Sequence, residues 1–311
     1  MPVLQFFVAT ILCVVAGIAS PARAQHVSPE SSQQVQGNLR HKYAQSGDMS
    51  IHYLATGDGP LVVLMHGFPD TSATWSKLIS ELADSYRVVA IDSRGTGLSS
   101  APVGVADYAM PHLLDDISAV MAAEGRGSAT LIGHDMGGAV AWRFALTYPH
   151  LVDGLAVLSM PHPAAYAKDL AANPEQRNAN QYFQMLSRPD AIDGLSAEML
   201  AGWVSEPGSR KAYVDTFERS GIAGMLKHLQ ANDPAATGSA DAGSLAINLP
   251  LLLIHGQDDG IILPSGHDHT WDYVSSDSAM LRVPGAGHFV HHDAPDVVNG
   301  AIRSWLDLRR E

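Results

Sequence analysis

The sequence predicts an α/β fold with a doubly wound, mostly parallel sheet and an inserted helical segment. Short, β-branched apolar runs recur along the chain, as in strands that are buried on both faces of a parallel sheet. Segments in which apolar residues have helical spacing separate several of these runs, and this alternation is typical of the fold class. One long stretch, residues 161–246, lacks strand-like runs, which indicates a helical insertion.

The elements follow one another from residue 40. The expected strands are an opening hairpin of His41–Tyr43 and Ser50–Leu54, then Leu61–Met65, Arg87–Ile91, Ala129–Ile132, Leu155–Leu158, Pro250–Ile254 and Met280–Val283. The expected helices are Trp75–Leu82, Gly137–Tyr148 and Pro295–Leu308. Residues 40–160 and 247–311 are therefore assigned to one core, and residues 161–246 to a helical lid. The lid ends in a flexible connection rich in small residues, Ala235–Gly243.

The N-terminal residues have the composition of a targeting segment. An apolar run, Phe6–Ile18, precedes the small-residue pattern Ala22-Arg23-Ala24, so residues 1–24 are expected to be a signal peptide cleaved near Ala24. Residues 25–39 are polar and are expected to be a disordered lead-in. The predicted location is the periplasm or the exterior, without stable membrane association after cleavage. No Lys or Arg precedes the apolar run, so an uncleaved anchor is the alternative.

Charge and cysteine content exclude several classes of function. Cleavage would remove one basic residue, Arg23, from the 19 and none of the 32 acidic ones, changing the net charge from −13 to −14. An acidic protein is a poor partner for nucleic acid or an anionic membrane. The single cysteine, Cys13, lies in the expected signal, so the mature chain would have no disulfide and no thiol chemistry. The sequence does not indicate an oligomeric state.

The segment Gly133–Gly138, of sequence GHDMGG, joins a predicted strand to a predicted helix. This is the context of a nucleophile elbow, whose tight turn requires small residues on either side of the nucleophile. Asp135 occupies the nucleophile position, where a serine is usual. Downstream, an acid (Asp258 or Asp259) and then His288 follow predicted strands, which is the chain order that this arrangement uses. The backbone N–H groups of Phe68 and Met136 are the expected oxyanion hole.

Other motifs in the sequence carry weaker signals. Gly95-Thr96-Gly97 lacks the third glycine of a dinucleotide-binding turn, so no nucleotide is expected. The triplets His267-Asp268-His269 and His291-His292-Asp293 lack a third, well-spaced ligand element, so both are interpreted as solvated loops. Neither a metal nor a cofactor is expected.

Four segments together resemble the soluble epoxide hydrolase branch of the α/β-hydrolase superfamily. They are His66–Pro69, Asp92–Ser99, Gly133–Gly138 and the pair formed by His255–Asp259 and Gly285–His288. The resemblance extends over nearly everything after residue 40, and it includes Met160–Pro163 at the start of the lid. It implies that Asp259 rather than Asp258 pairs with His288, and that Tyr182 donates a proton to the epoxide oxygen.

The chain departs from this family's pattern at two positions. Met136 stands where a tryptophan usually follows the nucleophile, and Leu229 stands where a second lid tyrosine is expected. His228 is a possible substitute donor, although a lid histidine is more often structural. These departures bear on the leaving group, because an epoxide oxygen needs a proton and a halide needs N–H donors.

An aspartate nucleophile predicts the type of reaction. An ionised carboxylate can attack saturated carbon without a base, and the product is an alkyl ester on Asp135 that His288 and water can hydrolyse. A serine would give an ether, which an oxyanion hole cannot help to cleave. The aspartate therefore predicts a hydrolase that acts at an epoxide or a carbon–halogen bond. The family resemblance implies that it opens small apolar epoxides to diols, with Phe68, Met136 and Tyr182 contacting the substrate. The alternatives are a haloalkane or haloacid dehalogenase and a ligand-binding protein without turnover.

Overall fold

The computed structural model describes residues 39–232 and 245–310, which form one eight-stranded sheet with helices on both faces. In chain order the strands are β1 (Arg40–Ser46), β2 (Met49–Thr56), β3 (Leu61–Met65), β4 (Arg87–Ile91), β5 (Ala129–His134), β6 (Val152–Leu158), β7 (Leu251–Gly256) and β8 (Ser278–Val283). Their order across the sheet is β1-β2-β4-β3-β5-β6-β7-β8. β2 pairs antiparallel with β1 and β4, and every other pair is parallel. The predicted fold class is confirmed.

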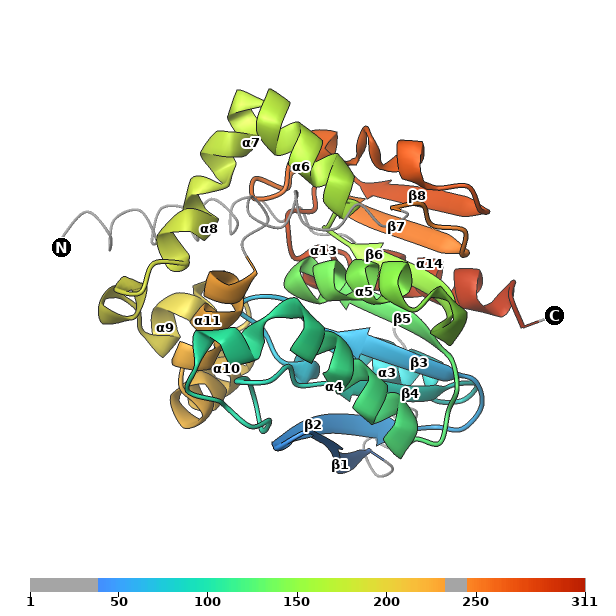
Figure 1. The fold of residues 1–311 in the computed structure, drawn as a ribbon, viewed down its shortest axis with the longest axis horizontal. Coiled ribbons are helices and arrows are strands. Elements are labelled where there is room, and N and C mark those ends of the chain that lie inside the picture. Colours follow the sequence, from blue (N-terminus) through green and yellow to red (C-terminus); the bar gives the residue numbers. More distant parts are fainter. Residues whose placement is uncertain (1–38, 233–244, 311) are drawn as a thin grey trace.

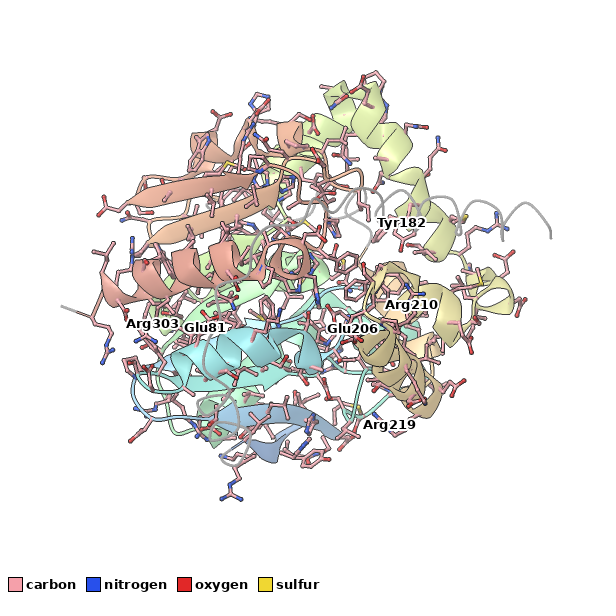
Figure 2. The ribbon with its side chains drawn as sticks, turned by 180° about the vertical axis from the view of Figure 1, so that it is seen from behind. Glu81, Tyr182, Glu206, Arg210, Arg219 and Arg303 are labelled. Carbon is pink, nitrogen blue, oxygen red and sulfur yellow. The ribbon has the colours of Figure 1, made fainter. Side chains whose placement is uncertain are left out.

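Two pairs of helices cover the sheet. Helices α4 (Met110–Ala123) and α5 (Asp135–Thr147) lie on the near face in Figure 1, and α3 (Ser76–Leu82) and α14 (Pro295–Asp307) lie on the face that Figure 2 shows. Strand β3 is apolar throughout because both of its faces are covered. Val62 and Leu64 join the core under α3 and α14, and Val63 joins the core under α4 and α5. A strand covered on both faces has no position for a polar side chain.

The predicted core elements agree with the structure in type. Strands β3 and β4 have the predicted bounds, and the other strands and helices differ by a few residues at their ends. Helix α4 is absent from the predicted elements. Its buried residues Leu113, Ile117 and Val120 have helical spacing, so the signal was present in the sequence.

The described secondary structure between β6 and β7 is helical apart from a single β-bridge at Ile247. The α-helices are α6 (Pro163–Ala172), α7 (Pro174–Ala179), α8 (Gln181–Leu186), α9 (Ala197–Leu200), α10 (Pro207–Ser220) and α11 (Ala223–Ala231). Figure 1 shows these helices gathered at one end of the sheet. They pack on the loops after β3 and β8 through a third apolar cluster, in which the Trp203 and Phe289 rings stack with centroids 3.9 Å apart.

Several predictions concern residues that the structure does not describe. The signal peptide, almost all of the lead-in and the connection Ala235–Gly243 lie outside residues 39–232 and 245–310. Within those two ranges, every helix is too short or too polar to cross a bilayer.

Candidate active site

Asp135 lies in a sharp turn between β5 and α5. Its φ of 50° is in the left-handed region, which a non-glycine residue adopts only when its surroundings fix it. A Cβ on Gly133 would lie 2.4 Å from the Gly137 carbonyl oxygen, and a Cβ on Gly137 would lie 2.4 Å from the Met65 carbonyl oxygen. Both glycines are therefore required by close packing, and the turn presents the Asp135 carboxylate at the end of the sheet.

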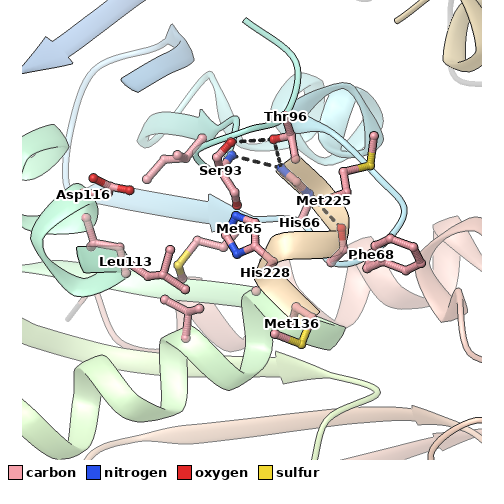
Figure 3. Close-up of a pocket in the computed structure, with 15 residues that line it drawn as sticks. Met65, His66, Phe68, Ser93, Thr96, Leu113, Asp116, Met136, Met225 and His228 are labelled. Carbon is pink, nitrogen blue, oxygen red and sulfur yellow. Dashed lines mark hydrogen bonds between the residues drawn. The ribbon is translucent and has the colours of Figure 1, made fainter. Parts of the chain in front are cut away.

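The peptide unit between Gly67 and Phe68 is fixed on both sides. Phe68 N–H donates to Asp135 Oδ1 at 2.8 Å, and the Gly67 carbonyl lies 2.9 Å from His66 Nδ1. His66 Nε2 accepts from Ser93 N–H at 3.1 Å, so the ring proton is on Nδ1 and donates to the Gly67 carbonyl. Figure 3 shows the hydrogen bonds of His66 beside a small cavity lined by His66, Phe68 and Met136. His66 thereby orients the N–H group that faces Asp135.

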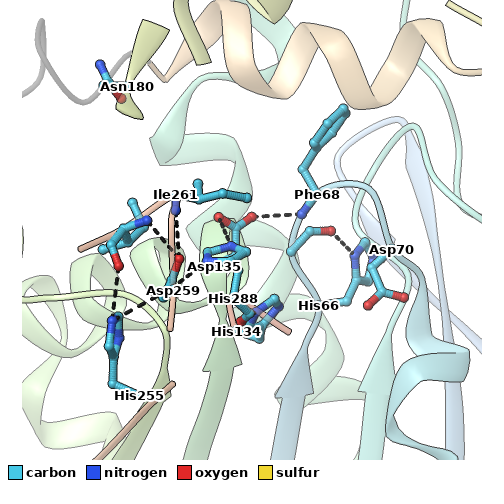
Figure 4. Close-up of polar contacts among 12 residues, drawn as sticks. His66, Phe68, Asp70, His134, Asp135, Asn180, His255, Asp259, Ile261 and His288 are labelled. Carbon is cyan, nitrogen blue, oxygen red and sulfur yellow. Dashed lines mark hydrogen bonds and ion pairs between the residues drawn. The ribbon is translucent and has the colours of Figure 1, made fainter. Parts of the chain in front are cut away.

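Asp135, His288 and Asp259 form a continuous hydrogen-bonded series (Figure 4). His288 Nε2 lies 3.2 Å from Asp135 Oδ2, and His288 Nδ1 lies 2.9 Å from Asp259 Oδ2. The other oxygen of Asp259 accepts from the N–H groups of Ile261 and Ile262 at 2.8 and 3.0 Å. The structure places Asp259 against His288, while Asp258 is exposed.

Charge interactions set the protonation states of this series. Burial disfavours the charged form of His288, but the negative charge of Asp259 and the hydrogen bond to Asp135 outweigh it and raise the pKa of His288 to about 10. Burial also opposes ionisation of Asp135, but the hydrogen bond from His288 holds the pKa of that carboxyl below its ordinary value. Asp135 is therefore an anion at neutral pH, and His288 remains protonated while Asp135 is charged.

A cavity of about 710 Å³ lies over Asp135 and His288. Apolar side chains predominate in its lining, among them Met110, Leu114, Met160, Phe183, Leu229 and Ile261. Phe68, Met136 and Tyr182 line the same space, and Figure 2 shows Tyr182 in the helical segment at one end of the sheet. Burial and the charge of Asp135 both raise the pKa of Tyr182, so its hydroxyl keeps its proton. The cavity therefore brings the three predicted substrate contacts, Phe68, Met136 and Tyr182, together with Asp135 and His288.

The contacts of Met136 and His228 bear on two further predictions. Phe68 N–H contacts Asp135, but among the described residues Met136 N–H does not donate to that carboxylate. His228 lines the smaller cavity instead of the one over Asp135, and its Nε2 donates to the Arg94 carbonyl at 2.7 Å. The substitute-donor interpretation of His228 therefore has no geometric support, and its contacts are those of a structural residue.

The structure also contains polar residues that sequence reasoning missed. Tyr166 and Asn180 line the large cavity, and the Tyr166 hydroxyl donates to Asn180 Oδ1 at 3.1 Å. They belong to no motif, so only the fold could identify them. His134 Nε2 donates to the His288 carbonyl at 2.9 Å, which supports the loop that carries His288.

One prediction about the histidine triplets is wrong. His267 and His291 are both buried, so neither triplet is simply a solvated loop. His267 Nε2 lies 3.1 Å from His255 Nδ1, and His255 Nε2 donates to the Ile262 carbonyl at 3.0 Å. This pair supports the loop that carries Asp259.

Comparison with known proteins identifies similar chains over most of this length. Residues 60–295 match the family model described as the alpha/beta hydrolase fold. The chain is 30% identical to mouse "Epoxide hydrolase 4" over 294 residues, covering 87% of this chain and 80% of that protein. A mutant of an epoxide hydrolase from Bacillus megaterium has a similar structure, with a TM-score of 0.79, 28% identity and coverage of 86% of this chain and 100% of that one. A solved structure from work on epoxide hydrolases in metagenomes from hot environments has a TM-score of 0.77 and 31% identity, covering 86% of this chain and 98% of that one.

Proposed function

This chain belongs to the α/β-hydrolase fold family, in its epoxide-hydrolase-like branch, and from that premise we propose that it opens small apolar epoxides to vicinal diols through an ester on Asp135. It is a hydrolase. One observation carries the proposal: the Asp135 carboxylate lies between a backbone N–H and His288, at the floor of an apolar cavity.

The two oxygens of Asp135 have different surroundings and hence different roles. Oδ1 accepts from Phe68 N–H, and Oδ2 faces His288 and the cavity. In the first step Oδ2 attacks an epoxide carbon, the O–C ester bond forms and the epoxide C–O bond breaks. The leaving oxygen takes the proton of the Tyr182 hydroxyl. Oδ1 becomes the carbonyl oxygen of the ester, already held by an N–H donor.

The second step uses the change of charge that the first step causes. Esterification removes the negative charge of Asp135, so one of the two anions that raise the pKa of His288 is lost. His288 can then release its proton, which restores the Tyr182 hydroxyl, and act as the base that activates a water molecule against the ester carbonyl. Asp259 keeps the proton of Nδ1 in place, so Nε2 is the nitrogen that accepts. As the tetrahedral intermediate collapses, the Cγ–Oδ2 bond breaks and His288 gives the proton taken from water to the departing diol oxygen. His288 then takes the proton of the new carboxyl, which restores the Asp135 carboxylate with one oxygen from water.

The cavity favours an epoxide over a carbon–halogen bond. A departing halide is stabilised by N–H donors, and among the described residues the N–H-bearing side chains of the cavity, besides His288, are Arg143, Asn180 and Asn232, with no tryptophan. Met136 and Leu229 offer no side-chain hydrogen-bond donor there. Tyr182 offers an O–H, which matches the need of a departing alkoxide for a proton.

The experiment that tests the proposal is trapping of the ester. A His288→Gln variant is incubated with styrene oxide and, in a separate sample, with 1-chlorohexane. In the styrene oxide sample, the peptide that contains Asp135 is expected to gain the full mass of the epoxide. The ester should persist, because no base remains to activate water. Intact-protein and peptide mass spectrometry measure the adduct.

Each outcome of this trapping experiment assigns one function. An adduct from the chloroalkane alone, with loss of HCl, would make the protein a dehalogenase. No adduct across a panel of epoxides and halides would leave only a binding role. The matched control is His150→Gln, a change to an exposed histidine, which should turn over epoxide and accumulate no adduct.

Removing the Tyr182 hydroxyl is expected to slow epoxide opening. Tyr182→Phe should lower kcat for diol formation about 10²-fold, because the alkoxide would leave without its proton donor. Tyr148→Phe, which removes another tyrosine hydroxyl from the lining of the same cavity, should change kcat less than about twofold. A Tyr182→Phe variant with unchanged kcat and an altered KM would show that Tyr182 only packs against the substrate.

A further inference from the structure

A second cluster of polar side chains lies behind the active-site loops. Asp70 follows β3, and His291 and His292 lie on the short helix α13 (Val290–Asp293) that follows His288. His291 Nε2 and His292 Nε2 each lie 3.9 Å from Asp70 Oδ2. One oxygen or nitrogen from each of the three residues falls within 4.8 Å of the others.

Asp70 is fully buried, and only one of its two carboxylate oxygens has hydrogen-bond partners. Its Oδ1 accepts from the Tyr213 hydroxyl and from Thr71 N–H, both at 2.7 Å. Its Oδ2 is buried without a hydrogen-bond partner and is directed at the two histidines. No lysine or arginine of the described part of the chain pairs with Asp70. A buried carboxylate oxygen without a hydrogen-bond partner is costly, so Asp70 needs either a proton or a bound cation at this position.

A hydroxyl group marks the point on which the histidines converge. Thr74 Oγ1 lies 2.8 Å from His291 Nε2 and 2.6 Å from His292 Nε2. The Nε2 atoms of His291 and His292 are therefore both directed at the space that the Thr74 hydroxyl oxygen occupies. Thr74 is only partly buried and can either rotate away or serve as a ligand itself.

We propose that Asp70, His291 and His292 form a binding site for one zinc-type divalent cation. Two imidazole nitrogens and one carboxylate oxygen are a ligand set that Zn²⁺ accepts, whereas Mg²⁺ and Ca²⁺ prefer oxygen ligands alone. Ligands about 2.0–2.1 Å from a tetrahedral Zn²⁺ are about 3.4 Å apart, so the observed 3.9 Å separations need to shorten by roughly half an ångström. His292, whose side chain is 31% exposed, provides the route of entry and can make this movement.

The position of the site gives the cation a structural role. Asp70 is two residues after Phe68, whose N–H faces Asp135, and His291 is three residues after His288. A cation held by both loops joins the oxyanion-hole loop to the catalytic-histidine loop. Its binding should therefore raise the thermal stability of the protein, because it binds only the folded state.

The test measures metal binding and unfolding, without any substrate. The full-length protein is stripped with EDTA, dialysed and titrated with ZnCl₂ by calorimetry and thermal denaturation. We expect one Zn²⁺ per chain and, at about 100 times the Kd, a rise in Tm of about 5 °C. MgCl₂ at the same concentration should leave Tm unchanged.

Two variants and one control locate the cation. His292→Gln should abolish stoichiometric binding and the rise in Tm, and its partial exposure makes folding of the variant secure. Asp70→Asn should do the same where it folds. His269→Gln removes an exposed histidine that lies 3.2 Å from Asp272 and should keep both signals. Undiminished Zn²⁺ binding in His292→Gln, an equal response to Mg²⁺, or no rise in Tm with 100 µM Zn²⁺ would overturn the proposal.

Discussion

Replacing Asp135 with asparagine is expected to lower kcat for diol formation by at least about 10⁴-fold, because the amide has no anionic oxygen to attack the epoxide. The replacement is nearly isosteric, and its oxygen can still accept from Phe68 N–H. Asparagine also tolerates the left-handed backbone that Asp135 adopts at φ 50°, so the turn should be preserved. The loss is measured by steady-state diol formation and by the circular dichroism spectrum of the same samples.

Two further variants distinguish the nucleophile from its partners. Asp259→Asn should slow the second step and leave the first intact, so that the ester on Asp135 accumulates, whereas Asp135→Asn should form no ester. Asp258→Asn, one residue away and exposed, should stay within about twofold of the wild type. If Asp135→Asn retained more than a hundredth of the activity, another group would have to be the nucleophile.

The core elements could be predicted because their signals are local. Leu61–Met65 is buried throughout and Arg87–Ile91 is buried after its first residue, so burial accounts for the apolar residues of both strands. The elbow at Asp135 could be predicted for a related reason, since close packing at Gly133 and Gly137 leaves no room for side chains there. Both cases depend on residues that are adjacent in the sequence.

The remaining features of the site depend on contacts between distant segments. The sequence alone left Asp258 and Asp259 as alternatives, and the structure separates them because the Ile261 and Ile262 N–H groups fix only Asp259. The His291-His292 pair lacks a ligand nearby in the sequence, and its third partner, Asp70, comes from the other half of the sheet. The large cavity depends on lid residues such as Tyr166 and Asn180, which belong to no recognisable motif.

Acidification from pH 7 to pH 4.5 is expected to destabilise the fold by about 5 kcal/mol through two buried histidines, and Asp70 opposes part of this loss because burial raises its pKa to about 7. Burial lowers the pKa of His162 and of His228 to about 4, against about 6.5 in the unfolded chain. Between these values the unfolded state binds more protons than the folded state, so stability falls as pH falls. Each histidine costs about 2.5 kcal/mol at pH 4.5, and the sum is a large part of the stability of an ordinary domain.

The opposite shift of His288 does not offset this loss. Its pKa of about 10 in the fold contributes stability that is fully present once the pH is below about 6.5, the pKa of the unfolded chain. His288 therefore does not change how stability falls between pH 6.5 and pH 4.5. The measurement is the free energy of unfolding in urea at several pH values between 4.5 and 8. A free energy that is constant from pH 7 to pH 4.5 would contradict the burial of these histidines as neutral groups.

A single substitution tests whether His162 contributes to this loss of stability at acid pH. His162 Nδ1 accepts from Ala164 N–H at 3.2 Å and its Nε2 donates to the Leu245 carbonyl at 3.0 Å, so protonation of the ring would break the first of these contacts. The oxygen of an asparagine can keep that contact at the start of α6 and does not titrate. His162→Asn should therefore make the free energy of unfolding depend less steeply on pH between pH 6 and pH 4.5. The change in slope should correspond to about one fewer proton taken up on unfolding. His150→Asn, at an exposed position, should leave the slope unchanged, so an equal effect of both variants would assign the loss of stability at acid pH to general charge repulsion.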